Sequence, residues 1–205
     1  MNLCEDIIST GLKYVDPSLY KDRGPNGKTG LPEDFRLIYQ WNKKEFIGGA
    51  HGYFGIFYML LVGIQILSPD FIAKPERTDK LRLWRDYILS TMKFLVAGQQ
   101  STGNFPSNVT KLRKGAPSDT VQFCHGSPGA VACLLKAAEV FTNHKDFFLQ
   151  SAVRACENIW NQGLCRKGWG LCHGITGNAY AFLSMYRFPG ELPNREEYLV
   201  KGVAF

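Results

Sequence analysis

The sequence lacks the features that direct a protein out of the cytoplasm or into a membrane. Its first residues, MNLCEDIISTG, contain neither the basic start nor the apolar stretch of a signal peptide, and Asn2 stands where myristoylation requires glycine. The longest apolar run, Tyr53–Leu67, is interrupted by Gln65 and is shorter than the roughly 20 residues that cross a bilayer. We therefore expect a cytoplasmic protein with no supported membrane attachment, in which this run forms a buried core helix.

Charge of one sign and the alternating pattern of β-strands are also scarce. The 24 Lys and Arg residues and the 18 Asp and Glu residues leave a net charge of +6, which is too small to indicate nucleic-acid binding by itself. No RNA-recognition, zinc-finger or helix-turn-helix signature accompanies it, so we expect no nucleic-acid partner. With 205 residues, 45% of them apolar, the chain has the composition of a globular protein, and we treat residues 1–205 as a segment of one domain.

Histidine is rare, and three of the four histidines lie in one repeated motif. The motif reads AHGYFG at 50–55, CHGSPG at 124–129 and CHGITG at 172–177, and an apolar stretch follows each copy. Glycines allow a tight turn or a close backbone approach, and stretches that are apolar nearly all round are typical of buried helices. The repeat therefore predicts three turns, each of which starts an inner helix.

Amphipathic segments lie between these apolar stretches. Two of them carry apolar residues at helical spacing: Leu81, Trp84, Ile88, Met92 and Leu95 in the first, and Phe148, Ala152, Ala155, Ile159 and Trp160 in the second. The segment Lys111–Ser118 is expected to be a loop. The alternation of buried and amphipathic helices predicts an all-α fold, an α/α toroid or solenoid of inner and outer helices.

Two Cys-His pairs, Cys124-His125 and Cys172-His173, stand at the start of two expected inner helices. Thiolate and imidazole are good zinc ligands, and the wide separation of the pairs favours a catalytic site over a zinc finger. A histidine beside an apolar stretch is more often a core residue than a ligand, so the residues alone leave both interpretations open for His51 and His125. The remaining cysteines are expected to be ordinary buried thiols: Cys4, Cys133, Cys156 and Cys165.

Four stretches together resemble the LanC-like family, the eukaryotic relatives of the bacterial lanthionine cyclases. They are GGAHGYFGIFYML at 48–60, STGNFP at 101–106, FCHGSPGA at 123–130 and KGWGLCHGITGNAYAFL at 167–183. Their order and approximate spacing match the family as well as their composition does. The resemblance implies an (α/α) toroid, and because the family's early and last repeats have no counterpart here, we expect an incomplete toroid.

By position, the resemblance implies that one Zn2+ ion is held by Cys124, Cys172 and His173, with a fourth position left to water or a substrate thiol. His51 corresponds to an acid/base candidate and His125 is the reserve, while Lys167 matches a basic position associated with glutathione contact. The implied reaction adds the thiol of glutathione to dehydroalanine or dehydrobutyrine residues of dehydrated, formerly phosphorylated peptides or proteins, which forms a thioether.

Two other functions compete with this interpretation. A protein that binds zinc and glutathione without turnover, in signalling or as an adaptor, would share the ligand set, and the expected incompleteness of the toroid favours it. A glycan-processing enzyme on an α/α toroid would need paired carboxylates. No acidic residue flanks the HGxxG turns, so this third alternative ranks last.

Overall fold

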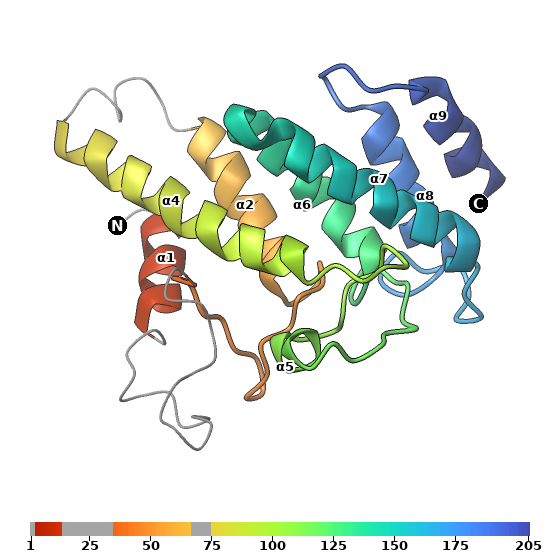
Figure 1. Cartoon of the computed structure of the whole chain (residues 1–205), viewed down its shortest axis with the longest axis horizontal. Coiled ribbons are helices and arrows are strands. Elements are labelled where there is room, and N and C mark those ends of the chain that lie inside the picture. The colour runs from red at the N-terminus through yellow and green to blue at the C-terminus, as the bar shows by residue number, and fades with distance from the viewer. Residues whose placement is uncertain (1–2, 14–34, 67–74) are drawn as a thin grey trace.

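The computed structural model describes residues 3–13, 35–66 and 75–205, and its secondary structure is helical (Figure 1). The first helices are α1 (Leu3–Lys13), α2 (Tyr53–Ile66), α4 (Pro75–Ala97) and α5 (Val109–Arg113). They are followed by α6 (Ser127–Val140), the 3-10 helix η1 (Thr142–His144), α7 (Lys145–Gln162), α8 (Ile175–Tyr186) and α9 (Arg195–Ala204). None of the helices in these ranges is long and apolar enough to cross a membrane. The prediction of an all-α fold is confirmed.

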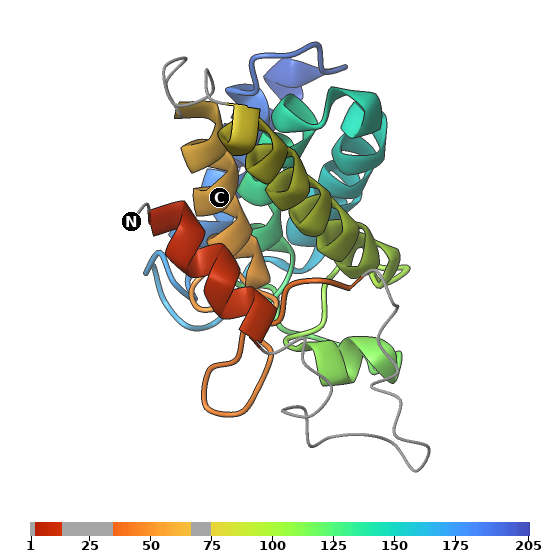
Figure 2. The ribbon, with the colours of Figure 1, turned by 90° about the vertical axis from the view of Figure 1, so that its left-hand side faces the viewer.

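The helices form an inner and an outer set. The inner helices α2, α6 and α8 pack side by side with α6 in the middle, while α7 packs on α6 and α9 packs on α8. Figure 2 shows α4 and α7 together on one side of α2 and α6. Arg85 attaches α4 to the end of α6, because its guanidinium donates to the carbonyl oxygen of Val140 over 2.7 Å. This arrangement agrees with the expected pairing of inner and outer helices.

The inner helices differ in how far they are buried. Helix α6 is buried along most of its length because α2, α7 and α8 surround it. Helix α2 buries one face, which includes Tyr53 and Leu61, whereas Met59 and Ile66 are exposed. The prediction of a fully buried helix over Tyr53–Leu67 is therefore wrong at the other face of α2, where α1 packs near Gly63 but leaves Met59 and Ile66 exposed. The last residue of that run lies outside the described residues.

The apolar stripes of α4 and α7 face the inner helices. All positions of the two predicted stripes are buried, apart from the half-buried Leu81 and from Trp160, which is 45% exposed. Trp160 follows the buried Ile159, and consecutive residues of a helix point about 100° apart around its axis. The stripe prediction is wrong at Trp160 because its indole lies at the edge of the buried face, where it packs against Phe182 and Phe205.

The short helix α5 replaces part of the loop expected at Lys111–Ser118. Asn108 caps its start, since the side-chain oxygen of Asn108 accepts a hydrogen bond from the backbone N–H of Lys111 over 2.9 Å. Gly115 follows the helix with φ at 61° and prevents its continuation. The expectation of a loop is wrong for Lys111–Arg113 because this cap stabilises a turn of helix that residue preferences alone did not predict.

Candidate metal centre

The three HGxxG turns lie next to one another where the inner helices begin. The backbone N–H of Gly49 donates to the carbonyl oxygen of Phe123 over 3.0 Å, which joins the first turn to the second. The N–H of Cys124 donates to the carbonyl oxygen of Cys172, also over 3.0 Å, which joins the second turn to the third. The sequence repeat is therefore a row of three turns, and this row brings together side chains that are far apart along the chain.

The last glycine of each motif is required by the tight backbone of its own turn. A Cβ atom at Gly55, Gly129 or Gly177 would lie 1.9–2.1 Å from a carbonyl oxygen of the same turn. No side chain can be accommodated at such a distance without moving the backbone. The same residue type therefore recurs at the same motif position for the same steric reason.

Buried polar side chains support the second and third turns. The Oδ1 atom of Asn104 accepts a hydrogen bond from the backbone N–H of Ser127, the first residue of α6, over 2.9 Å. The hydroxyl of Ser127 donates to Oδ1 of Asn158 on α7 over 2.9 Å. On α8, Nδ2 of Asn178 donates to the carbonyl oxygen of Val121 over 2.9 Å. Loss of one buried partner leaves the other unpaired, at a cost of about 1–3 kcal/mol, so these bonds hold the turns firmly on their helices.

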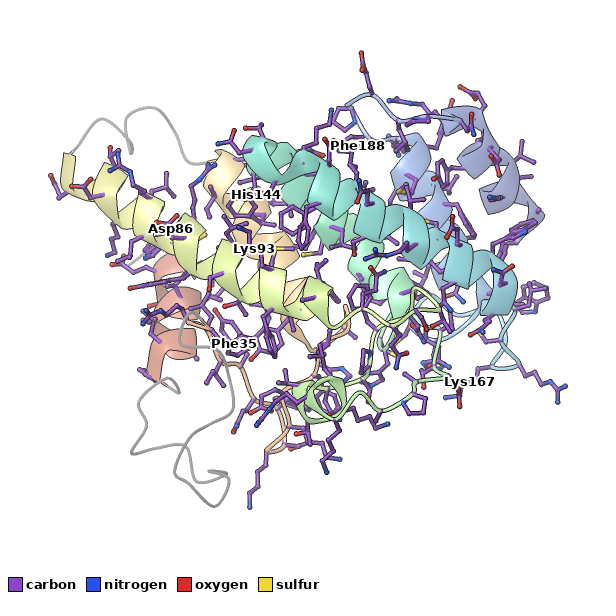
Figure 3. All side chains as sticks on the ribbon, viewed as in Figure 1. Phe35, Asp86, Lys93, His144, Lys167 and Phe188 are labelled. Carbon is purple, nitrogen blue, oxygen red and sulfur yellow. The ribbon has the colours of Figure 1, made fainter. Side chains whose placement is uncertain are left out.

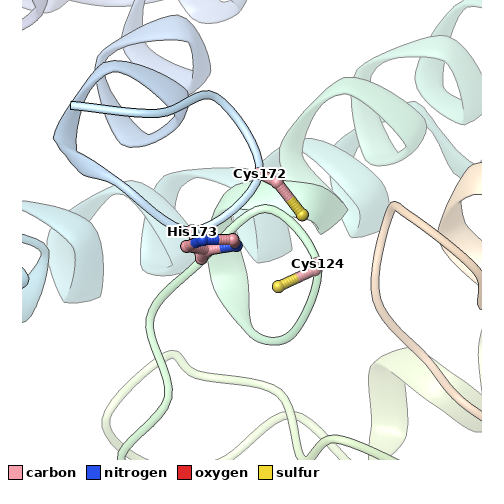
Figure 4. Close-up of side chains that lie close together, drawn as sticks. All are labelled: Cys124, Cys172 and His173. Atoms are coloured by element: carbon pink, nitrogen blue, oxygen red, sulfur yellow. The ribbon is translucent and has the colours of Figure 1, made fainter. Parts of the chain in front are cut away.

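The row of turns brings Cys124, Cys172 and His173 together (Figure 4). Their two sulfur atoms and a ring nitrogen all lie within 4.8 Å of one another. Ligand atoms around a tetrahedral zinc ion lie roughly 3.5 Å apart, given Zn–S and Zn–N bonds of about 2.3 and 2.0 Å. Two thiols and one imidazole at this separation fit zinc, and three protein ligands leave a fourth position open. Cys124 is buried, whereas Cys172 and His173 are exposed, so the third turn leaves the group open to solvent.

The protein's own groups disfavour the thiolate of Cys124. Burial raises the pKa of this thiol, and the hydrogen bond and charge of Cys172 raise it further. The positive charge of Lys167 opposes the rise. The Oε1 atom of Gln122 lies 3.6 Å from the Cys124 sulfur and accepts from the thiol. A bound divalent cation would reverse this preference because it stabilises thiolates directly.

The other two motif histidines, His51 and His125, contact each other next to these turns. Their ring centroids are 5.0 Å apart with the rings nearly perpendicular. His51 is exposed and lines a cavity of about 550 Å3 between α1 and the start of α2. His125 is half-buried, and its Nδ1 atom has no hydrogen-bond partner among the described residues. Neither histidine is therefore a core residue with both ring nitrogens satisfied by buried partners: His51 is open to solvent, and His125 keeps one nitrogen unpaired within the described part of the chain.

Positive charge surrounds His125. Burial lowers the pKa of His125, and the charges of His51, Lys111 and Lys167 lower it further. Lys167 is exposed on the loop before the third turn (Figure 3), and it also lowers the pKa of Cys124. The structure thus places this sequence-predicted residue close to the second turn. Lys111 on α5 was missed by the sequence analysis because no motif surrounds it and its segment was expected to be a loop.

Three of the four remaining cysteines, Cys4, Cys133 and Cys156, are buried as predicted. Burial raises the pKa of the Cys133 and Cys156 thiols, which makes them unreactive. Cys165 is only half-buried, and its sulfur donates to the carbonyl oxygen of His173 over 3.5 Å. The prediction of a buried thiol is wrong for Cys165, because the loop that carries it lies at the surface beside the third turn.

Comparison with known proteins shows which family this chain resembles. A model of the lanthionine synthetase C-like protein family matches residues 3–196. The chain is 31% identical over 185 residues to "Glutathione S-transferase LANCL1" of Danio rerio, an alignment that covers 90% of this chain and 38% of that protein. It is 33% identical over 162 residues to "LanC-like protein GCL1" of Arabidopsis thaliana, which covers 78% of this chain and 32% of the relative. The chain therefore spans about a third of the length of these relatives.

Proposed function

Because the chain belongs to the lanthionine synthetase C-like family, we propose that it adds the thiol of glutathione to dehydroalanine or dehydrobutyrine residues of formerly phosphorylated peptides, with one zinc ion at Cys124, Cys172 and His173. The observation that carries this proposal is the convergence of two sulfur atoms and a ring nitrogen within 4.8 Å from turns far apart in the sequence. The Danio rerio relative is named a glutathione S-transferase, which supports glutathione as the thiol.

The reaction requires a thiolate at neutral pH. Zinc bound at these residues would lower the pKa of the glutathione thiol that joins it. The exposed third turn, with Cys172 and His173, would give glutathione access to the site, whereas Cys124 is buried. The glutathione sulfur forms a bond to the β-carbon of the dehydro residue, and the electron pair of the double bond moves to the α-carbon as an enolate.

A general acid then protonates the α-carbon. His51 is our candidate because it is exposed and lines the cavity of about 550 Å3, where a peptide can lie. His125 is the reserve, and its ring contacts that of His51. Because the pKa of His125 is lowered, its imidazole holds a proton less firmly than that of an ordinary histidine.

Lys167 is our candidate for contact with glutathione. Its ammonium is exposed on the loop before the third turn, and its charge acts on Cys124 and His125. Glutathione carries carboxylates at neutral pH, so an ammonium group beside the thiol position would orient the tripeptide. Lysine acts here as a point charge on a flexible stem rather than as a bidentate clamp.

The proposal is tested by metal analysis and by an addition assay. Zinc per chain is measured by elemental analysis, and glutathione addition to a dehydroalanine peptide by mass spectrometry. We expect the wild type to hold one zinc ion and to add glutathione, and Cys172→Ala to lose both. Cys165→Ala is the matched control because it removes a thiol from the same loop outside the candidate ligand group. Folded wild-type protein that binds no zinc would overturn the assignment.

A second candidate function is binding without turnover, in signalling or as an adaptor. The solvent exposure of the candidate site favours this function, since Cys172, His173 and Lys167 are all exposed. An open site does not exclude water from a reactive intermediate. In the same assay, wild-type protein that holds zinc and glutathione but adds none to the peptide would favour this function over the first.

A further inference from the structure

The net positive charge of the described chain is concentrated in the loops that surround the candidate metal centre. Residues 40–52, 98–126 and 163–174 contain seven Lys or Arg residues and two acidic residues, Glu45 and Asp119. By contrast, residues 127–162 together with 175–205 contain six of each sign. We call the seven residues and the loops that carry them the basic loop face: Lys43, Lys44, Lys111, Arg113, Lys114, Arg166 and Lys167.

The three loops form one continuous face. The N–H of Val109 at the start of α5 donates to the carbonyl oxygen of Glu45 over 2.9 Å, and Phe46 pairs with Asn108. The turn hydrogen bonds from Gly49 and Cys124 then connect these segments to the third turn. Figures 1 and 2 show α5 and the loop before α2 together at the end of the molecule where the inner helices begin.

These basic side chains have no acidic partners of their own. All seven are exposed, and none forms an ion pair in the described part of the chain, where the four ion pairs lie on helices away from this face. The carboxylate of Glu45 is buried and accepts from Gln40 over 3.0 Å. Uncompensated charge of this kind attracts an anionic partner.

Exposed apolar side chains lie within the same face, directly beside the candidate ligands. Phe123 precedes Cys124, Leu171 precedes Cys172, and Trp169 is 77% exposed on the same loop as Lys167. Apolar groups between basic residues suit a partner with both acidic and apolar side chains. They provide contact area at the point where the proposed chemistry takes place.

We propose that the basic loop face binds acidic peptide segments that flank the reacting residue of the substrate. The choice of a peptide rests on the proposed function, whose reaction takes place on a peptide side chain. An anionic membrane is less well matched, because the charges come from three separate loops rather than from one amphipathic helix. The charge complementarity would draw acidic chains to the site and would weaken as salt rises.

The test is fluorescence anisotropy of labelled peptides with the full chain. An Asp- and Glu-flanked serine peptide is compared with the same peptide carrying Asn and Gln, and with phosphatidylserine vesicles and single-stranded RNA as competitors. The variant Lys44→Glu/Lys114→Glu is compared with Lys93→Glu/Arg187→Glu, which makes the same charge change on α4 and after α8, away from this face. Circular dichroism verifies that each variant is folded.

We expect the acidic peptide to bind at least about tenfold more tightly than the neutral one, and about tenfold less tightly to the first variant than to the control variant. Equal binding of both peptides, or equal losses in both variants, would overturn the proposal. Stronger binding of vesicles or RNA than of the acidic peptide would overturn it in favour of those partners. The assay needs neither zinc nor glutathione, so wild-type protein that binds the acidic peptide but adds no glutathione to a dehydroalanine peptide would contradict the proposed reaction alone.

Discussion

The second and third turns carry the same Cys-His pair, but their histidines have different surroundings. His173 places a ring nitrogen among the sulfur atoms of Cys124 and Cys172, whereas His125 packs its ring against His51 and Phe46. The second turn lies between two others, so its histidine meets the first turn. In the described part of the chain, the third turn has a neighbour on one side only. Identical local motifs therefore take different roles because of their place in the row.

The largest effect is expected from a substitution that disrupts the row of turns itself. A Cβ in Gly129→Ala would lie 2.1 Å from the Phe123 carbonyl oxygen and 2.6 Å from the Gly49 nitrogen, at the junction of the first two turns. We expect the free energy of unfolding to fall by at least about 3 kcal/mol, measured by urea denaturation. Gly170→Ala, where nothing lies within 4 Å, should change it by less than about 0.5 kcal/mol. Equal effects would contradict the steric account of the repeat.

Substitution of His173 and of His125 should affect zinc affinity differently. His173→Ala removes a candidate ligand, so we expect zinc affinity to fall by at least about 100-fold, as measured by competition with a chromophoric chelator. His125→Ala, which removes the equivalent histidine of the second turn, should leave the affinity within about tenfold of the wild type. A larger loss in His125→Ala than in His173→Ala would reverse the assignment of the two turns.

The two basic residues of the loop before the third turn should differ in their effect on the KM for glutathione. Lys167 acts on Cys124 and His125, so Lys167→Met should raise the KM for glutathione by about three- to fivefold, the effect of losing one exposed charge contact. The adjacent Arg166→Met removes the same charge and should leave the KM within about twofold. If both variants behave alike, only the total charge of the loop matters.

The smallest expected effect is a change in the pKa of His125. Its lowered pKa means that the neutral imidazole persists to a lower pH than in an ordinary histidine. In zinc-free protein, an NMR titration should place the His125 midpoint below about 6.5. Lys111→Met removes one of the positive charges that lower this pKa, so the midpoint should rise in that variant. A fall would show that Lys111 acts on His125 through packing rather than charge.

Much of the fold follows from local patterns. Helical spacing located the buried stripes of α4 and α7, and the HGxxG repeat located the start of each inner helix. These predictions succeeded because the apolar periodicity of a helix and the need for glycine in a tight turn both depend on residues that are close together in the sequence. Helix α5 and the half-exposed Trp160 were not predicted, because the first depends on a side-chain cap at Asn108 and the second on the neighbouring Phe182 and Phe205.

For the candidate site, the motifs alone identify the donor types, two thiols and several imidazoles, and the glycine that each turn needs. The convergence of Cys124, Cys172 and His173 depends on the fold, as do the contact of His125 with His51 and the electrostatic effect of Lys111 on His125. The physical reason is that a motif specifies its own backbone turn, whereas the partners of each side chain are set by hydrogen bonds and packing between segments far apart along the chain.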